Sequence, residues 1–226
     1  VVVCTWLPSQ TIAIPQSTLA QWVGQSGVHL QPLVEALKAD VLAHPVLHAD
    51  ETPVAMLDPG AGKTHRAYLW SYSVGAFDPI KAVVYDFADS RAGRHAQAFL
   101  GDWRGTLICD DYAGYNAVAL KGGIERLGCW AHARRKFVDA QKVQPKGKTG
   151  RADMALNLIN KLYGIERDLK EANDSERLSA RQQRSVPILD QLKAWLDKTQ
   201  PQVAGQTALG KAVNYLASNW SKLVRY

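Results

Sequence analysis

The chain of 226 residues has 46% hydrophobic and 21% charged residues, an ordinary globular composition that excludes a disordered or fibrous protein. Its three cysteines are an odd and sparse set, and no apolar run is long enough to span a bilayer, so we expect an intracellular protein without disulfides and without a membrane partner. A formal net charge of +6 and a pI near 9.2 are compatible with a polyanionic partner.

Residues 1–45 are predicted to form a helical N-terminal segment after an irregular start. Thr18 and Gln21 have the spacing of a capping box. Five apolar residues that follow share one helical face: Leu30, Leu33, Val34, Leu37 and Val41. Pro45 ends this segment.

Residues 46–140 follow a different pattern. The segments "PVLHADETPVAML", "RAYLWSYSVG" and "IKAVVYDFA" are typical of strands. They are followed by a predicted helix in "RAGRHAQAFLGDW", a strand in "TLICD", a short helix in "YAGYNAVAL", a strand in "IERLGCWAH" and a helix in "ARRKFVDAQ". This order is that of an α/β ribonuclease H-like core with a mixed sheet and flanking helices.

Residues 141–226 are predicted to be a basic loop, "QKVQPKGKTG", followed by a helical insertion region. Two groups of apolar residues recur there at helical spacing: Leu156, Ile159, Leu162, Tyr163 and Ile165, and then Ile188, Leu189, Leu192, Trp195 and Leu196.

Two aspartates follow or interrupt strands that the predicted fold makes neighbours. In a ribonuclease H-like sheet the first and fourth strands are adjacent and parallel, which would bring Asp50 and Asp110 together at one edge. Mg²⁺ prefers carboxylate oxygens, and two such ions can promote phosphoryl transfer. The alternative for Asp110, and the ordinary role for Asp111, is a cap on the following helix.

Two neighbouring features favour structural roles. Glu51 should point to the face of its strand opposite Asp50, because side chains alternate along a strand. The segment "GAGKT" resembles a phosphate-binding loop, but the first glycine of that motif is replaced by Leu57, so a hairpin turn is predicted instead.

Cys129 and His132 have Cys-x-x-His spacing. A structural zinc site needs four ligands, and the chain supplies no obvious second pair. We therefore predict a packing or site-shaping role for both residues, with metal binding as the alternative.

Positive charge is concentrated between Lys121 and Arg151, a segment with nine Lys and Arg residues and only two carboxylates. Within this segment, Arg134, Arg135 and Lys136 are the candidate contacts to DNA phosphates. The alternative is a solvated helix face followed by a linker.

The blocks "LHADETPVAML", "RAYLW", "DDYAGYN" and "GCWAHARRKF" resemble the central catalytic region of bacterial insertion sequence 66 family transposases, which belong to the DDE class. Similarity extends to "STLAQWVG", "YGIE" and "KAVNYLASNW". The resemblance implies that Asp50 and Asp110 are the first two catalytic carboxylates and bind Mg²⁺ (or Mn²⁺). Asp111 stands where the family usually has Gly.

The same resemblance implies cleavage at element ends and transfer to target DNA by transesterification. The expected partners are both DNAs, further copies of the chain and other proteins of the same element, in the nucleoid of the bacterial cytoplasm.

The family's third catalytic acid is a Glu in an Asn-Asn-x-x-Glu block, and this chain contains no Asn-Asn pair. It starts at Val1 and stops at "NWSKLVRY", so we expect a truncated transposase that binds DNA without transferring strands alone. Glu166 matches a family position in the insertion and is a poor substitute. The alternatives are an inactive module that binds DNA or a partner transposase, and a metal-dependent nuclease.

Overall fold

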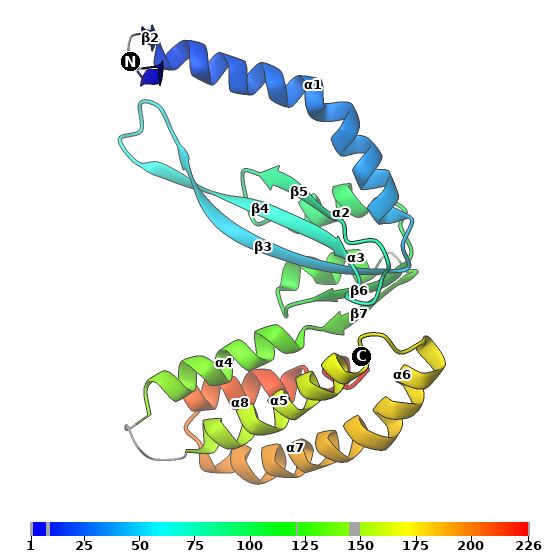
Figure 1. The fold of residues 1–226 in the computed structure, drawn as a ribbon. Coiled ribbons are helices and arrows are strands. Elements are labelled where there is room, and N and C mark those ends of the chain that lie inside the picture. Colours follow the sequence, from blue (N-terminus) through cyan, green and yellow to red (C-terminus); the bar gives the residue numbers. More distant parts are fainter. Residues whose placement is uncertain (1, 8–9, 121, 145–149, 226) are drawn as a thin grey trace.

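The protein is described by a computed structural model that covers residues 2–7, 10–120, 122–144 and 150–225 (Figure 1). A five-stranded sheet with small helices lies between a long N-terminal helix and a C-terminal helical body. None of the helices in these ranges has the length and apolar character needed to cross a membrane.

The N-terminus forms a hairpin rather than the irregular start that the sequence suggested. Strand β1 (Val2–Leu7) pairs antiparallel with β2 (Gln10–Ile14). Both segments are rich in β-branched residues, which favour the extended backbone.

Helix α1 (Gln16–Leu42) starts immediately after Pro15, whose carbonyl accepts the N–H groups of Thr18 and Leu19. Thr18 is therefore inside the first turn, and the predicted capping box is wrong. The fixed φ of Pro15 already directs the chain into the helix, so the helix begins earlier than a Thr cap would allow.

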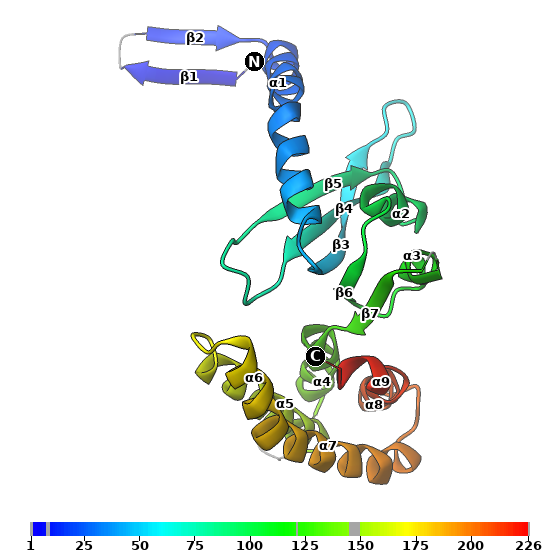
Figure 2. The ribbon, with the colours of Figure 1, turned by 90° about the vertical axis from the view of Figure 1, so that its right-hand side faces the viewer.

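The apolar face of α1 exists but is largely exposed. The helix leaves the body at a steep angle (Figures 1 and 2), and only Val41, near its C-terminal end, is buried. Leu33 keeps 67% of its surface exposed and Leu30 keeps 52%. Sequence periodicity located this face correctly, but most of it has no partner within the described ranges.

The central sheet has the order β5-β4-β3-β6-β7. Its strands are β3 (Val46–Leu57), β4 (Thr64–Val74), β5 (Val83–Ala88), β6 (Gly105–Cys109) and β7 (Ile124–Gly128). The first three are antiparallel, while β3 pairs parallel with β6, and β6 with β7. The predicted mixed α/β class and the parallel pairing of its first and fourth strands are confirmed.

The turn between β3 and β4 contains Gly60 and Gly62, both with positive φ (90° and 64°). This backbone conformation suits glycine and closes a hairpin. The hairpin turn predicted for "GAGKT" is confirmed.

Helices α2 (Arg94–Leu100) and α3 (Asn116–Leu120), with a 3-10 turn at Ala113–Tyr115, pack against the sheet. The largest fully buried side chains of this first cluster are Leu47, Trp70, Tyr72, Leu100, Leu107 and Tyr115. They form the core that holds β3 and β6 side by side.

Helix α4 (Trp130–Lys142) begins one residue after β7 ends, with Cys129 between them. The predicted strand through His132 is therefore wrong in its last residues. Ala133, Phe137 and Ala140 recur at helical spacing and are buried, so helical packing determines the structure of this stretch.

The C-terminal body is helical, as predicted. Its helices are α4, α5 (Arg151–Asp168), α6 (Asp174–Ala180), α7 (Val186–Thr199), α8 (Ala208–Ser218) and α9 (Trp220–Leu223). The buried residues of α4 belong to this second cluster. The predicted basic loop falls partly on residues 145–149, outside the described residues, and the predicted domain boundaries stay a prediction.

Candidate functional site

Asp50 lies in β3, and Asp110 is the first residue after β6, the parallel neighbour of β3. His48 of β3 is paired with Ile108 of β6, and each aspartate follows its member of this pair by two residues. Because side chains alternate along a strand, residues two positions on share a face. The two aspartates therefore lie near each other at the edge where β6 ends, and the charges of both act on His132.

Each carboxylate uses one oxygen for a backbone N–H. Asp50 Oδ1 accepts from Glu51 N at 3.0 Å, and Asp110 Oδ1 accepts from Tyr112 N at 2.9 Å. The bond to Tyr112 closes the turn before the 3-10 helix, but the N-cap of that helix is Tyr112 and no side chain caps it, so the capping alternative for Asp110 is wrong. The side chains are 46% and 21% exposed.

Asp111 points elsewhere. Its Oδ1 accepts a hydrogen bond from Lys222 Nζ at 3.0 Å and is 3.9 Å from Arg126 Nη2. Burial raises the pKa of Asp111, but Lys222 and Asn219 outweigh it and lower that pKa overall. Asp111 thus ties the strand exit to the end of the helical body, a different role from the cap expected for it.

Cys129 and His132 lie beside the two carboxylates. His132 Nε2 is 3.6 Å from Asp50 Oδ1. The pKa of His132 is raised, first by Cys129, against the opposing effect of burial, and further by the charges of Asp50 and Asp110. At the start of α4, the imidazole of His132 therefore lies where the negative charges of both aspartates act on it.

Burial raises the pKa of Cys129, but the net shift is downward because His132 and the N–H groups at the start of α4 favour the thiolate. Among the residues described, no group of three or more His, Cys, Asp and Glu side chains is placed to hold a metal ion. The site-shaping role of the Cys-x-x-His pair and the metal-binding alternative both stay predictions.

Glu51 is buried behind this edge, with its side chain 0% exposed. It accepts hydrogen bonds from Tyr115 Oη at 2.7 Å and from Arg91 Nε at 2.8 Å. Burial raises the pKa of Glu51, while the bonds to Tyr115 and Arg91 lower it. The structural role predicted for Glu51 is confirmed.

Arg91 is a residue of this site that the sequence did not reveal. Its guanidinium lies 3.9 Å from the centre of the Tyr112 ring, and its Nη2 is 3.8 Å from Asp110 Oδ2. It thus connects buried Glu51 to a candidate catalytic carboxylate. Arg91 comes from the loop before α2, and no motif spacing marks it.

Arg126 supports the turn that carries Asp110. It donates to the carbonyl oxygens of Asp110 at 2.5 Å and Tyr112 at 3.2 Å, and its Nε lies 3.1 Å from Cys109 Sγ. The first two contacts hold the backbone at Asp110 and Tyr112, and the third reaches the side chain of Cys109.

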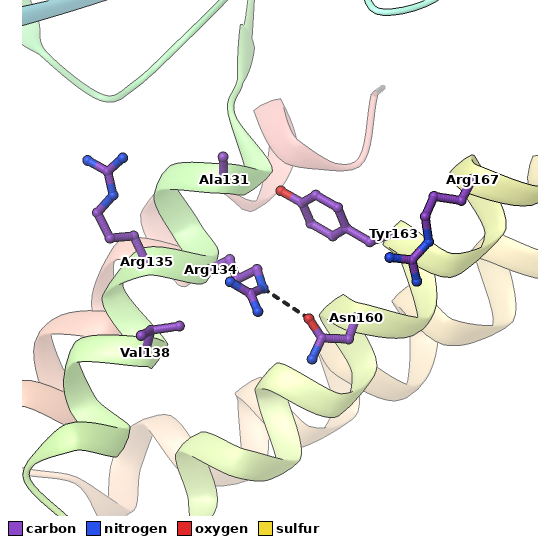
Figure 3. Close-up of a pocket in the computed structure, with 7 residues that line it drawn as sticks. All are labelled: Ala131, Arg134, Arg135, Val138, Asn160, Tyr163 and Arg167. Carbon is purple, nitrogen blue, oxygen red and sulfur yellow. Dashed lines mark hydrogen bonds between the residues drawn. The ribbon is translucent and has the colours of Figure 1, made fainter. Parts of the chain in front are cut away.

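The three predicted phosphate contacts separate into two groups. Arg134 and Arg135 line a pocket of about 770 Å³ between α4 and α5 (Figure 3). Lys136 is directed toward α8, where its Nζ lies 5.7 Å from the centre of the Tyr215 ring. Arg167 of α5 also lines the pocket and was missed by the sequence, because helical spacing alone does not show which helix faces α4.

Glu166, weighed above as a substitute acid, is engaged elsewhere. Its two carboxylate oxygens accept from Arg181 Nε at 2.9 Å and Nη2 at 2.7 Å. This bidentate pair joins α5 to the turn before α7.

The sequence profile of the transposase IS66 family matches residues 4–226. The chain belongs to this family. It is 34% identical to "Uncharacterized protein y4jD" of Sinorhizobium fredii (strain NBRC 101917 / NGR234), over 94% of this chain and 43% of that protein. It is 30% identical to "Uncharacterized protein y4qI" of the same strain, over 95% of this chain and 41% of that protein.

The match to the IS66 family covers the sheet, α4 and the helical body, and so includes every candidate residue described above. The chain spans about two fifths of the length of these relatives. The family resemblance predicted from the motifs is confirmed.

Proposed function

We propose that this chain is the part of an insertion-sequence transposase that holds the first two catalytic carboxylates and binds DNA beside them. The fold would be ribonuclease H-like, with Asp50 and Asp110 as metal ligands for DNA cleavage and strand transfer. The observation that carries the proposal is the position of Asp50 in β3 and of Asp110 directly after the parallel neighbouring strand β6, in a transposase-family chain.

The donor set agrees with Mg²⁺ or Mn²⁺ in kind. Both groups are carboxylates, both are partly exposed, and each keeps an oxygen that no backbone N–H occupies within the described structure. Hard divalent cations prefer such oxygens. When bound, the ions would activate the attacking oxygen and stabilise the leaving oxygen of a phosphoryl transfer.

The chain's own residues would then have distinct tasks. Asp50 and Asp110 bind the ions, while Arg91 and Arg126 keep Asp110 in place. His132 lies against Asp50 and would limit the directions in which this carboxylate can turn. Arg134 and Arg135 would hold the DNA backbone beside the site through charge.

Two carboxylates without a third acidic partner should hold the ions weakly, because the described residues provide no third ligand group there. We therefore expect DNA binding and weak metal binding from this chain, but strand transfer only when a further acidic side chain completes the site. A chain that binds DNA without metal would support the alternative of an inactive DNA-binding module.

Metal binding can be tested with Mn²⁺ by electron paramagnetic resonance or titration calorimetry. Asp50→Asn and Asp110→Asn should each abolish measurable binding, because each removes one of two charged ligands. Asp111→Asn is the matched control, since it removes the adjacent carboxylate that pairs with Lys222 instead. Equal Mn²⁺ affinity in all three variants and the parent chain would refute the proposed site.

A further inference from the structure

The pocket between α4 and α5 has the chemistry of a nucleotide site. Arg134 of α4 and Arg167 of α5 lie on either side of Tyr163 and Asn160, and Arg135 also lines the pocket but extends away from Tyr163 (Figure 3). Within the described part of the chain, none of the three arginines is in an ion pair. Arg134 Nε donates to the neutral Asn160 Oδ1, at 2.9 Å.

Arginines that are in no ion pair and line a concave surface favour an anionic ligand, and phosphate is the anion that guanidinium binds with matched geometry. Tyr163 is 37% exposed and offers an aromatic ring inside the same pocket. Val138 and Ala131 add apolar surface. Aromatic rings interleaved with basic groups are typical of sites where unpaired bases stack.

The dimensions exclude a duplex from the pocket itself. Its volume of about 770 Å³ is within the usual range for small-ligand pockets. A DNA duplex, whose major groove alone admits an α-helix, cannot enter the gap between two packed helices. A single unstacked nucleotide is small enough to enter the pocket.

The pocket also adjoins the candidate catalytic edge. Its lining residue Ala131 is next to His132, and His132 contacts Asp50. Burial raises the pKa of Tyr163, and the neighbouring charge of Cys129 raises it further, which agrees with a position close to the start of α4.

We propose that this pocket binds one nucleotide that has left the base stack of the DNA, with Tyr163 against the base and Arg134 and Arg167 on its phosphates. This inference rests on the proposed function, because it assumes that DNA is the substrate. It adds a distinct requirement: DNA with an extrahelical or unpaired nucleotide should bind more tightly than an intact duplex.

The test uses the 226-residue chain and three fluorescent DNA probes of one sequence, measured by anisotropy: a full duplex, the same duplex with one extra unpaired nucleotide, and the single strand. Tyr163→Ala should weaken binding to the bulged and single-stranded probes by about tenfold, as expected when one base no longer stacks, and leave the duplex unaffected. Tyr163→Phe should keep the preference.

Tyr85→Ala is the matched control, because Tyr85 is 58% exposed on β5 and lies outside the pocket. Arg167→Gln is a second variant that does not remove an ion pair within the described structure. It should lower the salt dependence of single-strand binding by about 0.7 for its one phosphate.

Equal loss on all three probes, or no loss with Tyr163→Ala, would overturn the nucleotide pocket and leave the proposed DNA binding intact. Failure of the parent chain to bind any probe would overturn both proposals. Retained preference for the bulged probe after Arg167→Gln, with an unchanged salt dependence, would remove Arg167 from the site.

Discussion

At the scale of single residues, Arg91 connects buried structure to the candidate chemistry. Its guanidinium is held by Glu51, which has no exposed side-chain surface, and approaches Asp110 Oδ2. A buried carboxylate that loses its cationic partner is strongly destabilising, because the charge is left uncompensated. Breaking the pair of Glu51 and Arg91 should therefore destabilise the fold next to a proposed metal ligand.

We expect Arg91→Met to lower the free energy of unfolding by about 2–3 kcal/mol, below the upper end for buried pairs because Arg91 itself is 41% exposed. Urea unfolding followed by circular dichroism measures the change.

The control is the pair Glu51→Met with Arg91→Met, which removes both charges and should recover most of the loss. If Arg91→Met alone left the free energy of unfolding unchanged, solvent rather than Arg91 would compensate the charge of Glu51.

The sequence alone identified some of these residues and missed others. Asp50 and Asp110 were found from motifs, and the inward direction of Glu51 followed from strand alternation. Arg91 is 40 positions from Glu51, on a loop with no periodicity. Only the folded chain shows that the two meet.

At the scale of elements, α1 shows that an apolar helical face in the sequence need not be packed against the rest of the protein. Periodicity correctly gave an apolar helical face, but periodicity cannot say what covers that face. Near the C-terminal end of α1, Val41 and Leu42 join the core of the sheet, so Val41 is fully buried while Leu33 is exposed. The N-terminal hairpin was missed because short apolar runs do not distinguish a strand from an irregular segment.

This difference predicts a large loss of stability for one side-chain truncation in the helix and a small change for another. Val41→Ala should cost about 1.5–3 kcal/mol, because it removes a fully buried side chain from the core. Leu33→Ala should change stability by no more than about 0.5 kcal/mol, as for other surface positions.

Thermal and urea unfolding of both variants provide the comparison. A large loss for Leu33→Ala would show that its face is covered in solution, which the described residues do not show.

At the scale of the whole molecule, positive charge and the two hydrophobic clusters are arranged around α4. Its start adjoins the sheet edge with Asp50, and its buried face belongs to the helical cluster. Arg134 and Arg135 face the pocket, whereas Lys136 is directed toward α8. A basic surface on both sides of one helix would contact a long stretch of DNA backbone.

Replacing Arg134, Arg135 and Lys136 together with Gln should weaken binding to any duplex and lower its salt dependence by about 0.9 for each phosphate that is no longer neutralised. Affinity measured between low and moderate salt gives this slope.

The matched control replaces Lys170, Lys193 and Lys198 with Gln, which removes equal charge from other parts of the helical body. If both triple variants behave alike, the effect is one of net charge, and the basic face of α4 is only a solvated surface.

The parallel pairing of β3 with β6 also sets the order in which the molecule can form. Val46 pairs with Thr106, so the strand carrying Asp50 must wait for a partner 60 residues later in the chain. The hairpin of β3 with β4 needs only near neighbours, and contacts between near neighbours form fastest, whereas the helical body also depends on the packing of α4 against the distant α8. Asp50 and Asp110, the proposed metal ligands, would therefore come together only after the β3–β4 hairpin has formed, and a chain released before that step would have no candidate metal site.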